Sequence, residues 1–373
     1  MDLSDRPRYH FRPQKGCMND PNGLRTGSER ASVLRRPVSR VLSALSAHGQ
    51  AVSEPAHWGH ARTKDFLHWE ELPFALVLDA PYDDGGCWSG TACVHEGRLY
   101  LAYASVHVPP GERRRETVSI AWSDDGVHFT KYAGNPVIDR YPPQAGPDFR
   151  DPAIARIGDG FACLMASGSP AHGTAQLLLY ESGDLLHWRY CGIAREWADA
   201  VYAECPSLVP LPDGSVLVSA SIARQGGHTF AVAAGELRDG RFFPQTEGSP
   251  ERGPDGYAGQ IFRDPRGRLL LISWLPGLNF TGHDEHNVSC LSVPHELTVK
   301  NGRICAYPVE EVRSLLRRED PALTRTADGF SVARQGRDPV VHTGRIDDLC
   351  LIRDGYILEV FVNGGETVYS LLL

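Results

Sequence analysis

The sequence has no long hydrophobic run. A membrane-spanning helix needs about 20 consecutive apolar residues, and no stretch of the 373 residues approaches that length. The chain starts MDLSDRPRYHFRPQKG, which contains no apolar segment of the kind found in secretory signal peptides. We therefore expect a soluble, cytoplasmic protein with no membrane partner.

Cysteine motifs and positive charge are also lacking. The nine cysteines form no CxxC pair and leave one over, so neither a zinc site nor a disulfide framework is indicated. We predict reduced thiols, no metal and no cofactor. The 38 basic residues are outnumbered by 46 acidic ones, which gives a net charge of −8. This balance argues against a nucleic-acid partner and suits a small neutral ligand.

Turn-forming residues are abundant. The 38 glycines and 27 prolines favour short strands over long helices. Apolar or alternating runs bounded by Gly, Pro or Asp predict such strands at 98–106, 159–168, 214–223 and 268–275.

A polar turn followed by an aromatic residue recurs along the chain, in TKDFLHWEEL, WSDDGVHFTKY and ESGDLLHWRY. Its anchors Trp69, Phe129 and Trp188 are separated by 60 (129 − 69) and 59 (188 − 129) residues. Fainter copies around Phe243 and Ile304 continue the series with steps of 55 (243 − 188) and 61 (304 − 243). Five such units predict an all-β, five-bladed β-propeller. A β-sandwich of hairpins is the alternative, which the even spacing disfavours.

The character of the chain changes after Pro308. We expect residues 1–308 to form the propeller and residues 309–373 to form a linker and a shortened β-sandwich-like segment. Within the latter, 310–319 is a short charged helix or linker, and 347–373 is two or three strands around an Asn-Gly-Gly turn. Because this segment is small for an independent domain, we expect it to pack on the last blade.

Three motifs contain carboxyl groups, and each has a plain structural interpretation. NDPNG at 19–23 has the composition of a turn. In DFRDPAI, Arg150 and Asp151 are compatible with a weak surface ion pair. In YAECPSLVP, Glu204 lies between apolar residues at the edge of a predicted strand, which is harder to explain as surface.

In their order along the chain these motifs resemble glycoside hydrolase family 32. The resemblance rests on NDPNG, HWGHARTKDFLHWEELPFAL, GCWSG, FRDP and EC, and covers about residues 1–24 and 57–310. It implies a five-bladed propeller followed by a β-sandwich. It also implies a retaining hydrolase that releases fructose from β-fructofuranosyl ends of sucrose, sucrose 6-phosphate or short fructans.

The resemblance further implies catalytic roles for Asp20 as nucleophile, Glu204 as general acid/base and Asp151 as the carboxylate that holds substrate hydroxyls. Retaining chemistry needs two carboxyl groups about 5–5.5 Å apart, one to attack and one to move the proton. A third carboxylate can strengthen hydroxyl contacts as positive charge develops on the sugar. Since Glu204 must carry a proton, we expect it to be the least solvated of the three.

Supporting residues follow from the same resemblance. Arg150 and Asn19 are candidates for binding or orienting the sugar, and Trp88 with Ser89 resembles the border of the fructose pocket. Trp274 matches a family aromatic near the sugar. For either tryptophan a position in the core is an equal alternative.

The segment 25–56 departs from the family. It is rich in Arg, Ser and Ala, has no aromatic residue and shows no strand alternation, so we expect poor order there. The family has an aromatic-rich strand at this place, ending in Tyr-Gln-Tyr. We hypothesise that the segment is read out of frame around Val33–Ser39, which the nucleotide sequence would test.

Alternatives to fructoside hydrolysis stay open. A propeller that lost turnover with its first blade would only bind carbohydrate, and a fructosyltransferase would use a sugar in place of water as the acceptor. Arg113, Arg114 and Arg115 form a candidate cluster for a phosphorylated substrate, although an exposed charged loop is the simpler interpretation. The sequence does not predict an oligomeric state.

Overall fold

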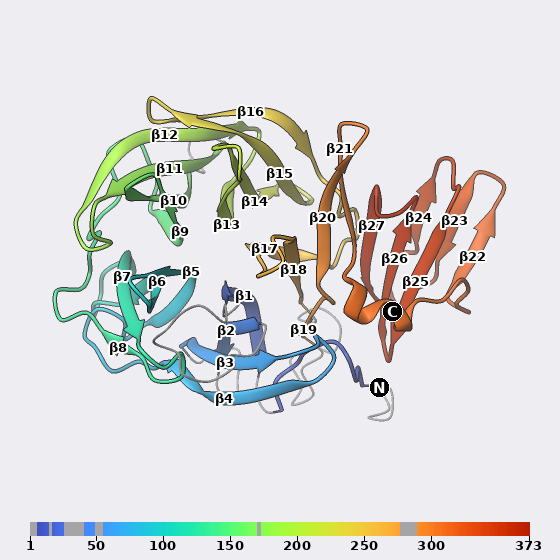
Figure 1. Ribbon diagram of the computed structural model, residues 1–373, viewed down its shortest axis with the longest axis horizontal. Coiled ribbons are helices and arrows are strands. Elements are labelled where there is room, and N and C mark those ends of the chain that lie inside the picture. Colours follow the sequence, from blue (N-terminus) through green and yellow to red (C-terminus); the bar gives the residue numbers. More distant parts are fainter. Residues whose placement is uncertain (1–5, 15–16, 26–40, 49–54, 170–172, 277–288) are drawn as a thin grey trace.

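The computed structural model describes residues 6–14, 17–25, 41–48, 55–169, 173–276 and 289–373. Strands dominate this part of the chain, and the single annular body with a smaller block beside it is visible in Figure 1. The all-β prediction is confirmed. Within the described residues, no helix is long and apolar enough to cross a membrane.

Five antiparallel sheets follow one another along the chain. The first contains β1 (Cys17–Arg25), β2 (Val41–His48), β3 (His57–Thr63) and β4 (Trp69–Leu76). The second contains β5 (Gly86–His95), β6 (Arg98–His107), β7 (Arg115–Ser123) and β8 (Thr130–Lys131). The third contains β9 (Asp148–Ile157), β10 (Gly160–Ser169), β11 (Thr174–Ser182) and β12 (Trp188–Ala198). The fourth contains β13 (Tyr202–Pro210), β14 (Val216–Arg224), β15 (Gly227–Arg238) and β16 (Arg241–Gly248). The fifth contains β17 (Tyr257–Arg263), β18 (Leu269–Leu275), β19 (Cys290–Leu291), β20 (His295–Lys300) and β21 (Arg303–Pro308).

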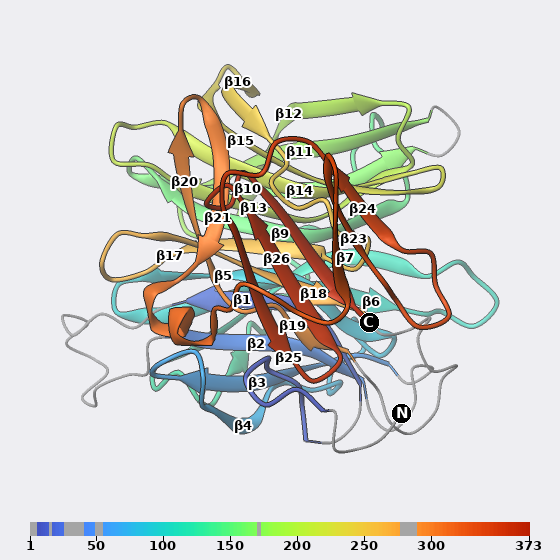
Figure 2. The same cartoon turned by 90° about the vertical axis from the view of Figure 1, so that its right-hand side faces the viewer.

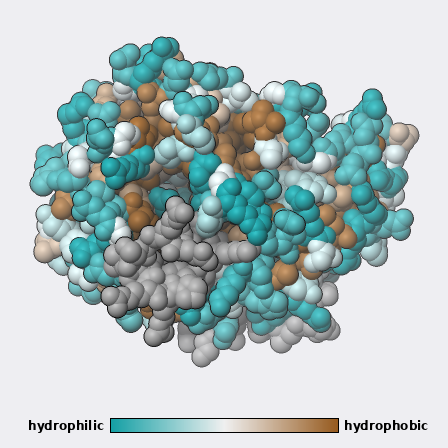
Figure 3. Space-filling model, viewed as in Figure 1, coloured by the Kyte–Doolittle hydropathy of each residue, from teal (hydrophilic) through white to brown (hydrophobic). Residues whose placement is uncertain are grey.

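The first strand of each sheet lies nearest the centre of the molecule (Figure 1). Contacts run from β1 to β5, β9, β13 and β17 in turn, and β17 contacts β1 again. Apolar side chains fill the space between neighbouring sheets, as Leu164, Leu177 and Val218 do between the third and fourth. The face seen in Figure 3 is accordingly hydrophilic over much of its area, with hydrophobic residues in patches between. Residues on the first strands therefore meet around one axis although they are far apart in sequence.

The repeated turn has the same hydrogen bonds in its three clear copies. In the third, the Ser182 hydroxyl accepts the N–H of Leu185 at 3.0 Å, and Asp184 accepts the N–H groups of Leu186 and His187 at 2.9 Å each. The residue at the tip has positive φ, 69° at Leu185, and glycine takes this place at Gly126. Trp69 and Trp188 each open the last strand of a sheet, and Phe129 directly precedes one. The predicted equivalence of these anchors is confirmed.

The expectation of poor order over residues 25–56 does not hold for Val41–His48, which forms a strand. This segment is β2, whose backbone pairs with β1 and, from Val41 opposite Thr63 to Ala47 opposite His57, with β3. Two neighbouring strands offer unpaired backbone groups, and this tertiary context outweighs weak local preference. Residues 26–40 and 49–54, with the Val33–Ser39 stretch of the frame hypothesis, lie outside the described residues.

The C-terminal region begins with a short 3-10 helix, η2 (Glu310–Leu315), where a short charged helix or linker was expected. One three-stranded sheet contains β22 (Leu323–Thr326), β23 (Gly329–Val332) and β24 (Val340–Thr343), and another contains β25 (Leu349–Asp354), β26 (Ile357–Val362) and β27 (Thr367–Leu372). The strands of this region run along one side of the molecule (Figure 2). The two sheets share a core that includes Phe330 and Leu358. Phe361 and Val368 join the core of the fifth sheet, which confirms the expected packing on that sheet.

Candidate active site

The first strand of each of the five sheets around the ring has a break in its pairing at a corresponding position. The register shifts lie between Met18 and Pro21 in β1, Cys87 and Gly90 in β5, Arg150 and Ala153 in β9, Glu204 and Ser207 in β13, and Tyr257 and Gln260 in β17. Such bulges bend a strand and redirect its side chains, and they are frequent beside active sites. Here they carry the sequence motifs singled out above.

Three residues in these bulges have left-handed backbone conformations. The φ angles are 58° at Asp151, 48° at Cys205 and 50° at Ala258. Non-glycine residues adopt this conformation at a cost of about 1–3 kcal/mol, and they do so mainly where the surrounding structure holds them for function. The same unusual backbone conformation therefore recurs at the bulges of three successive sheets.

The bulges surround a cavity of about 290 Å³. Its lining consists of Asn19, Asp20, Ala56, Trp88, Ser89, Arg114, Arg150, Asp151 and Glu204. The structure thus brings together every residue predicted for the site except Trp274. Asp20, Asp151 and Glu204, separated by 131 (151 − 20) and 53 (204 − 151) positions, face one small space.

Asp20 receives two donors on one oxygen. Ser89 Oγ lies 2.5 Å from Asp20 Oδ2, and Cys205 Sγ lies 3.3 Å from the same atom. Burial is the largest influence and raises the pKa of Asp20, the Ser89 hydrogen bond lowers it, and the charge of Glu204 raises it again, to about 6. The Asp20 carboxylate is therefore mostly ionised at neutral pH, with its second oxygen left for other contacts.

Asp151 lies deeper than its neighbours and is 3% exposed. Its Oδ2 accepts the backbone N–H of Cys205 at 2.8 Å. Burial raises its pKa, the charge of Arg150 lowers it, and the charges of Glu204 and Asp20 raise it, to about 7. At neutral pH this carboxyl therefore exists in both charged and protonated forms.

Glu204 is bound on both oxygens. Arg150 donates to Oε1 from Nη2 at 3.0 Å and from Nε at 3.2 Å, while the Tyr257 hydroxyl donates to Oε2. The expectation that Glu204 is the least solvated of the three is wrong, because its side chain is 21% exposed. Its longer side chain extends into the cavity, whereas the shorter Asp151 stays beneath the Cys205 backbone.

Arg150 is buried and forms ion pairs with several acidic residues. Its side chain is 9% exposed and also contacts Glu116 at 3.0 Å and Asp148 at 3.1 Å. The guanidinium lies 5.4 Å from the ring centroid of Tyr202. The interpretation of Arg150 as one half of a surface ion pair is therefore wrong, and this arginine positions Glu204.

Two residues of the site went unnoticed in the sequence. Glu116 is buried and anchors Arg150, and Tyr257 contacts Glu204. Tyr257 follows Glu204 by 53 residues (257 − 204), the same step that separates Glu204 from Asp151. Equal steps between first strands are a signal that would have located Tyr257.

Trp274 lies behind the site. It is 6% exposed, packs with Cys205, Ala258 and Tyr257, and donates from Nε1 to Ser289 Oγ at 2.5 Å. Among the described residues it does not line the cavity. Trp274 therefore occupies the core position that the sequence analysis left open as an alternative. Trp88, by contrast, lines the cavity, with the guanidinium of Arg114 4.8 Å from its ring centroid.

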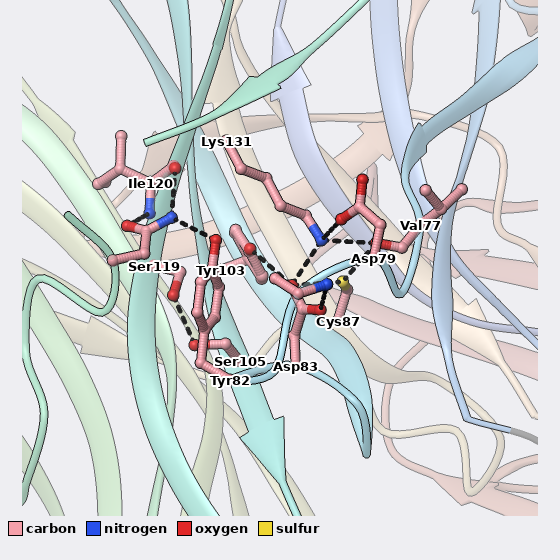
Figure 4. A network of polar contacts seen from close by, with 12 residues as sticks. Val77, Asp79, Tyr82, Asp83, Cys87, Tyr103, Ser105, Ser119, Ile120 and Lys131 are labelled. Carbon is pink, nitrogen blue, oxygen red and sulfur yellow. Dashed lines mark hydrogen bonds and ion pairs between the residues drawn. The ribbon is translucent and has the colours of Figure 1, made fainter. Parts of the chain in front are cut away.

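A buried polar network holds the segment that leads to Trp88 and Ser89 (Figure 4). Asp83 is fully buried, and its Oδ2 accepts from Lys131 Nζ at 2.6 Å and from the Tyr103 hydroxyl at 3.0 Å. Lys131 also binds Val77 O at 2.6 Å and Asp79 Oδ1 at 2.5 Å. The network ties the loop before β5 to β8 in the same sheet, and so fixes where β5 begins.

Comparisons with known proteins point to one family. The model of the glycosyl hydrolases family 32 N-terminal domain matches residues 44–308. A sucrose-6-phosphate hydrolase of Escherichia coli is 30% identical over 355 residues, covering 90% of this chain and 71% of that protein. A raffinose invertase of Escherichia coli is 30% identical over 335 residues, covering 84% and 67%. The structure of a GH32 beta-fructofuranosidase from Bombyx mori matches with a TM-score of 0.83 and 25% identity, over 100% of this chain and 90% of that chain.

The fold, the cavity and these matches together define a glycoside hydrolase, which confirms the predicted class of enzyme. The family model spans more than half of the sequence, and the E. coli relative reaches 30% identity over most of both chains. This chain belongs to glycoside hydrolase family 32.

Proposed function

We propose that this protein releases fructose from the β-fructofuranosyl end of sucrose-type substrates with retention of configuration. The observation that carries the proposal is the meeting of Asp20, Asp151 and Glu204 around one cavity of about 290 Å³. The names of the relatives, sucrose-6-phosphate hydrolase, raffinose invertase and beta-fructofuranosidase, support the same reaction.

In this proposal Asp20 attacks the anomeric carbon while the Glu204 carboxyl gives its proton to the leaving oxygen. Ser89 and Cys205 keep the Asp20 carboxylate oriented through one oxygen. Glu204 then takes a proton from water, which displaces Asp20 and releases fructose. Asp151 accepts hydrogen bonds from fructosyl hydroxyls, and Asn19 and Trp88 border the sugar.

We further propose that the five sheets are the blades of a five-bladed β-propeller and that β22–β27 form a shortened β-sandwich. The closed series of contacts among the five first strands supports the propeller. The shared core of the two C-terminal sheets supports the sandwich. The division at residues 308 and 309 and the cytoplasmic location stay predictions.

Substitution of the two central carboxyl groups tests the mechanism. Asp20→Asn should lower fructose release from both sucrose and an activated aryl fructoside by on the order of 10³-fold or more, because no nucleophile remains. Glu204→Ala should lower sucrose turnover by about 10²- to 10⁴-fold but spare the aryl fructoside, whose leaving group needs little protonation. Circular dichroism provides the control for folding. Substantial activity of Asp20→Asn on either substrate would contradict the assignment of the nucleophile.

Product analysis distinguishes the alternatives. A hydrolase forms free fructose from sucrose at low substrate concentration, a fructosyltransferase forms longer saccharides, and a binding protein binds sucrose without forming either. Sucrose, sucrose 6-phosphate and inulin serve as substrates in parallel.

A phosphorylated substrate is favoured by the position of Arg114. Of the three consecutive arginines only Arg114 lines the cavity, where it lies beside Trp88 and also donates from Nε to Glu116 Oε1 at 2.8 Å. Arg115 pairs with Glu112 at 2.5 Å. We expect Arg114→Gln to raise KM for sucrose 6-phosphate by about tenfold and to leave KM for sucrose nearly unchanged, since a phosphate contact is lost. Arg113→Gln is the matched control. An equal effect of Arg114→Gln on both substrates would show that Arg114 does not read the phosphate.

A further inference from the structure

A second cavity, of about 310 Å³, lies at the C-terminal halves of the same five first strands. It shares no lining residue with the candidate active site. Arg156 follows Asp151 by five positions on β9, which corresponds to about 16 Å along a strand. The ring of strands therefore opens onto a separate space beyond the site described above.

The charged residues that line this second cavity are all positive. Arg25 on β1, Arg156 on β9 and Arg263 at the end of β17 line it, and its lining contains no Asp or Glu. Arg25 donates from Nε to Ala92 O at 2.9 Å. Within the described part of the chain, no carboxylate forms an ion pair with Arg25 or Arg156.

The charges of two of the arginines act on one buried thiol of the lining. Cys93 is 1% exposed, and burial raises the pKa of its thiol while the charges of Arg25 and Arg156 lower it. Burial also lowers the pKa of the Arg25 guanidinium. A buried cation without a counter-charge is costly, and an anion in the adjacent space removes that cost.

A buried amide belongs to the wall of the same cavity. Gln260 lines the cavity, is 3% exposed, and its Nε2 has no hydrogen-bond partner. Buried amide N–H groups are rarely left without an acceptor in folded proteins. An anion held against this wall would supply an acceptor close to Gln260.

We propose that this second cavity binds a small oxyanion, either inorganic phosphate or the phosphate group of a small sugar ester. Guanidinium groups pair with phosphate oxygens through two parallel hydrogen bonds, and Gln260 supplies a further donor. The volume excludes a macromolecule. A bound anion contacts β1, β9 and β17 at once and stabilises the closed ring of strands.

Calorimetric titration with sodium phosphate, at constant ionic strength and with saturating fructose to occupy the active site, tests the proposal. We expect one phosphate per chain and a midpoint of thermal unfolding that rises with phosphate concentration. Arg156→Gln, at an exposed position that should not disturb folding, is expected to weaken binding by about tenfold or more. Arg241→Gln, an exposed arginine on the outer strand β16, is the matched control and should bind as the wild type does.

Competition experiments with glucose 6-phosphate, and with glucose as the control that lacks a phosphate, distinguish the source of the anion. Competition of glucose 6-phosphate with inorganic phosphate supports a site for a phosphate ester, and binding of inorganic phosphate alone supports a site for the free anion. Absence of phosphate binding by the wild-type chain, or equal binding by Arg156→Gln and Arg241→Gln, would overturn the proposal.

Discussion

Asp20 illustrates how single contacts set the chemistry of a residue. Its carboxyl is buried, which raises its pKa, and one hydroxyl from Ser89 limits that rise, so that the pKa is about 6. The nucleophile proposed here must be ionised, so we expect the free enzyme to lose activity as the pH falls through this value. The Ser89 hydrogen bond extends the active range toward acid.

Removal of that hydroxyl should move the acidic limb of the pH profile. In Ser89→Ala the pKa of Asp20 rises further, because the contact that lowers it is gone. We expect kcat/KM for sucrose at pH 5.5 to fall by about tenfold or more, with a much smaller loss at pH 8. Profiles of kcat/KM against pH measure the shift, and Ser215→Ala, in the turn before β14, is the control. A uniform loss at every pH would instead indicate that Ser89 acts only by binding substrate.

At the scale of an element, the position of the loop before β5 depends on the polar partners of one buried residue, Asp83. Asp83 is fully buried, and it forms an ion pair with Lys131, which comes from β8, the outer strand of the same sheet. The strand that follows carries Trp88 and Ser89. A structural network outside the cavity is thus connected to two of its lining residues.

Breaking this network should damage both stability and activity. Lys131→Met leaves Asp83 buried and unpaired, which we expect to cost about 3–5 kcal/mol in the free energy of unfolding. Asp79→Asn removes only the exposed partner of the same lysine and should cost less than about 1 kcal/mol. Urea denaturation and sucrose turnover measure the two effects. Equal stability of both variants would mean that Asp83 does not depend on Lys131.

At the scale of the molecule, a buried charge cluster joins the two ends of the chain. His10 Nδ1 lies 2.9 Å from Asp354 Oδ2, and its Nε2 lies 3.6 Å from Glu359 Oε1. Burial lowers the pKa of His10, but hydrogen bonding and the charges of Asp354 and Glu359 raise it to about 9. Burial raises the pKa of Asp354, but the hydrogen bond and charge of His10 lower it to about 2. Burial also raises the pKa of Glu359, and the charge of His295 followed by the contacts with His10 lowers it to about 2.

The signs of these shifts define a pH window for the cluster's contribution. The raised pKa of His10 adds stability that is complete below about pH 6.5 and is lost as the pH rises through about 9. The lowered pKa values of the two acids add stability that is present above about pH 4.5 and is lost as the pH falls toward 2. We expect His10→Gln to be destabilised by about 3–5 kcal/mol at pH 6 and by less at pH 9.5. Urea denaturation at both values is the test, and a difference that does not change with pH would contradict it.

Much of this protein was predictable from local patterns. The repeated turn around Asp65, Asp125 and Asp184 depends on contacts within a few residues, so its spacing predicted the anchors and the all-β class. The carboxyl groups of Asp20, Asp151 and Glu204 were identified from short sequence motifs, NDPNG, FRDP and EC, whose order along the chain resembles that of the family.

Other features were decided only by the tertiary structure. β2 forms from a sequence with weak strand preference because β1 and β3 supply its hydrogen-bond partners. Glu204 is more exposed than expected and Trp274 lies in the core, since burial depends on which side chains share the axis and not on neighbours in sequence. The sequence by itself determined the strands, the turns and the identity of the carboxyl groups, which are local matters. Their depth, their charge state and their meeting in one cavity depend on long-range packing, and only the folded ring of strands decides them.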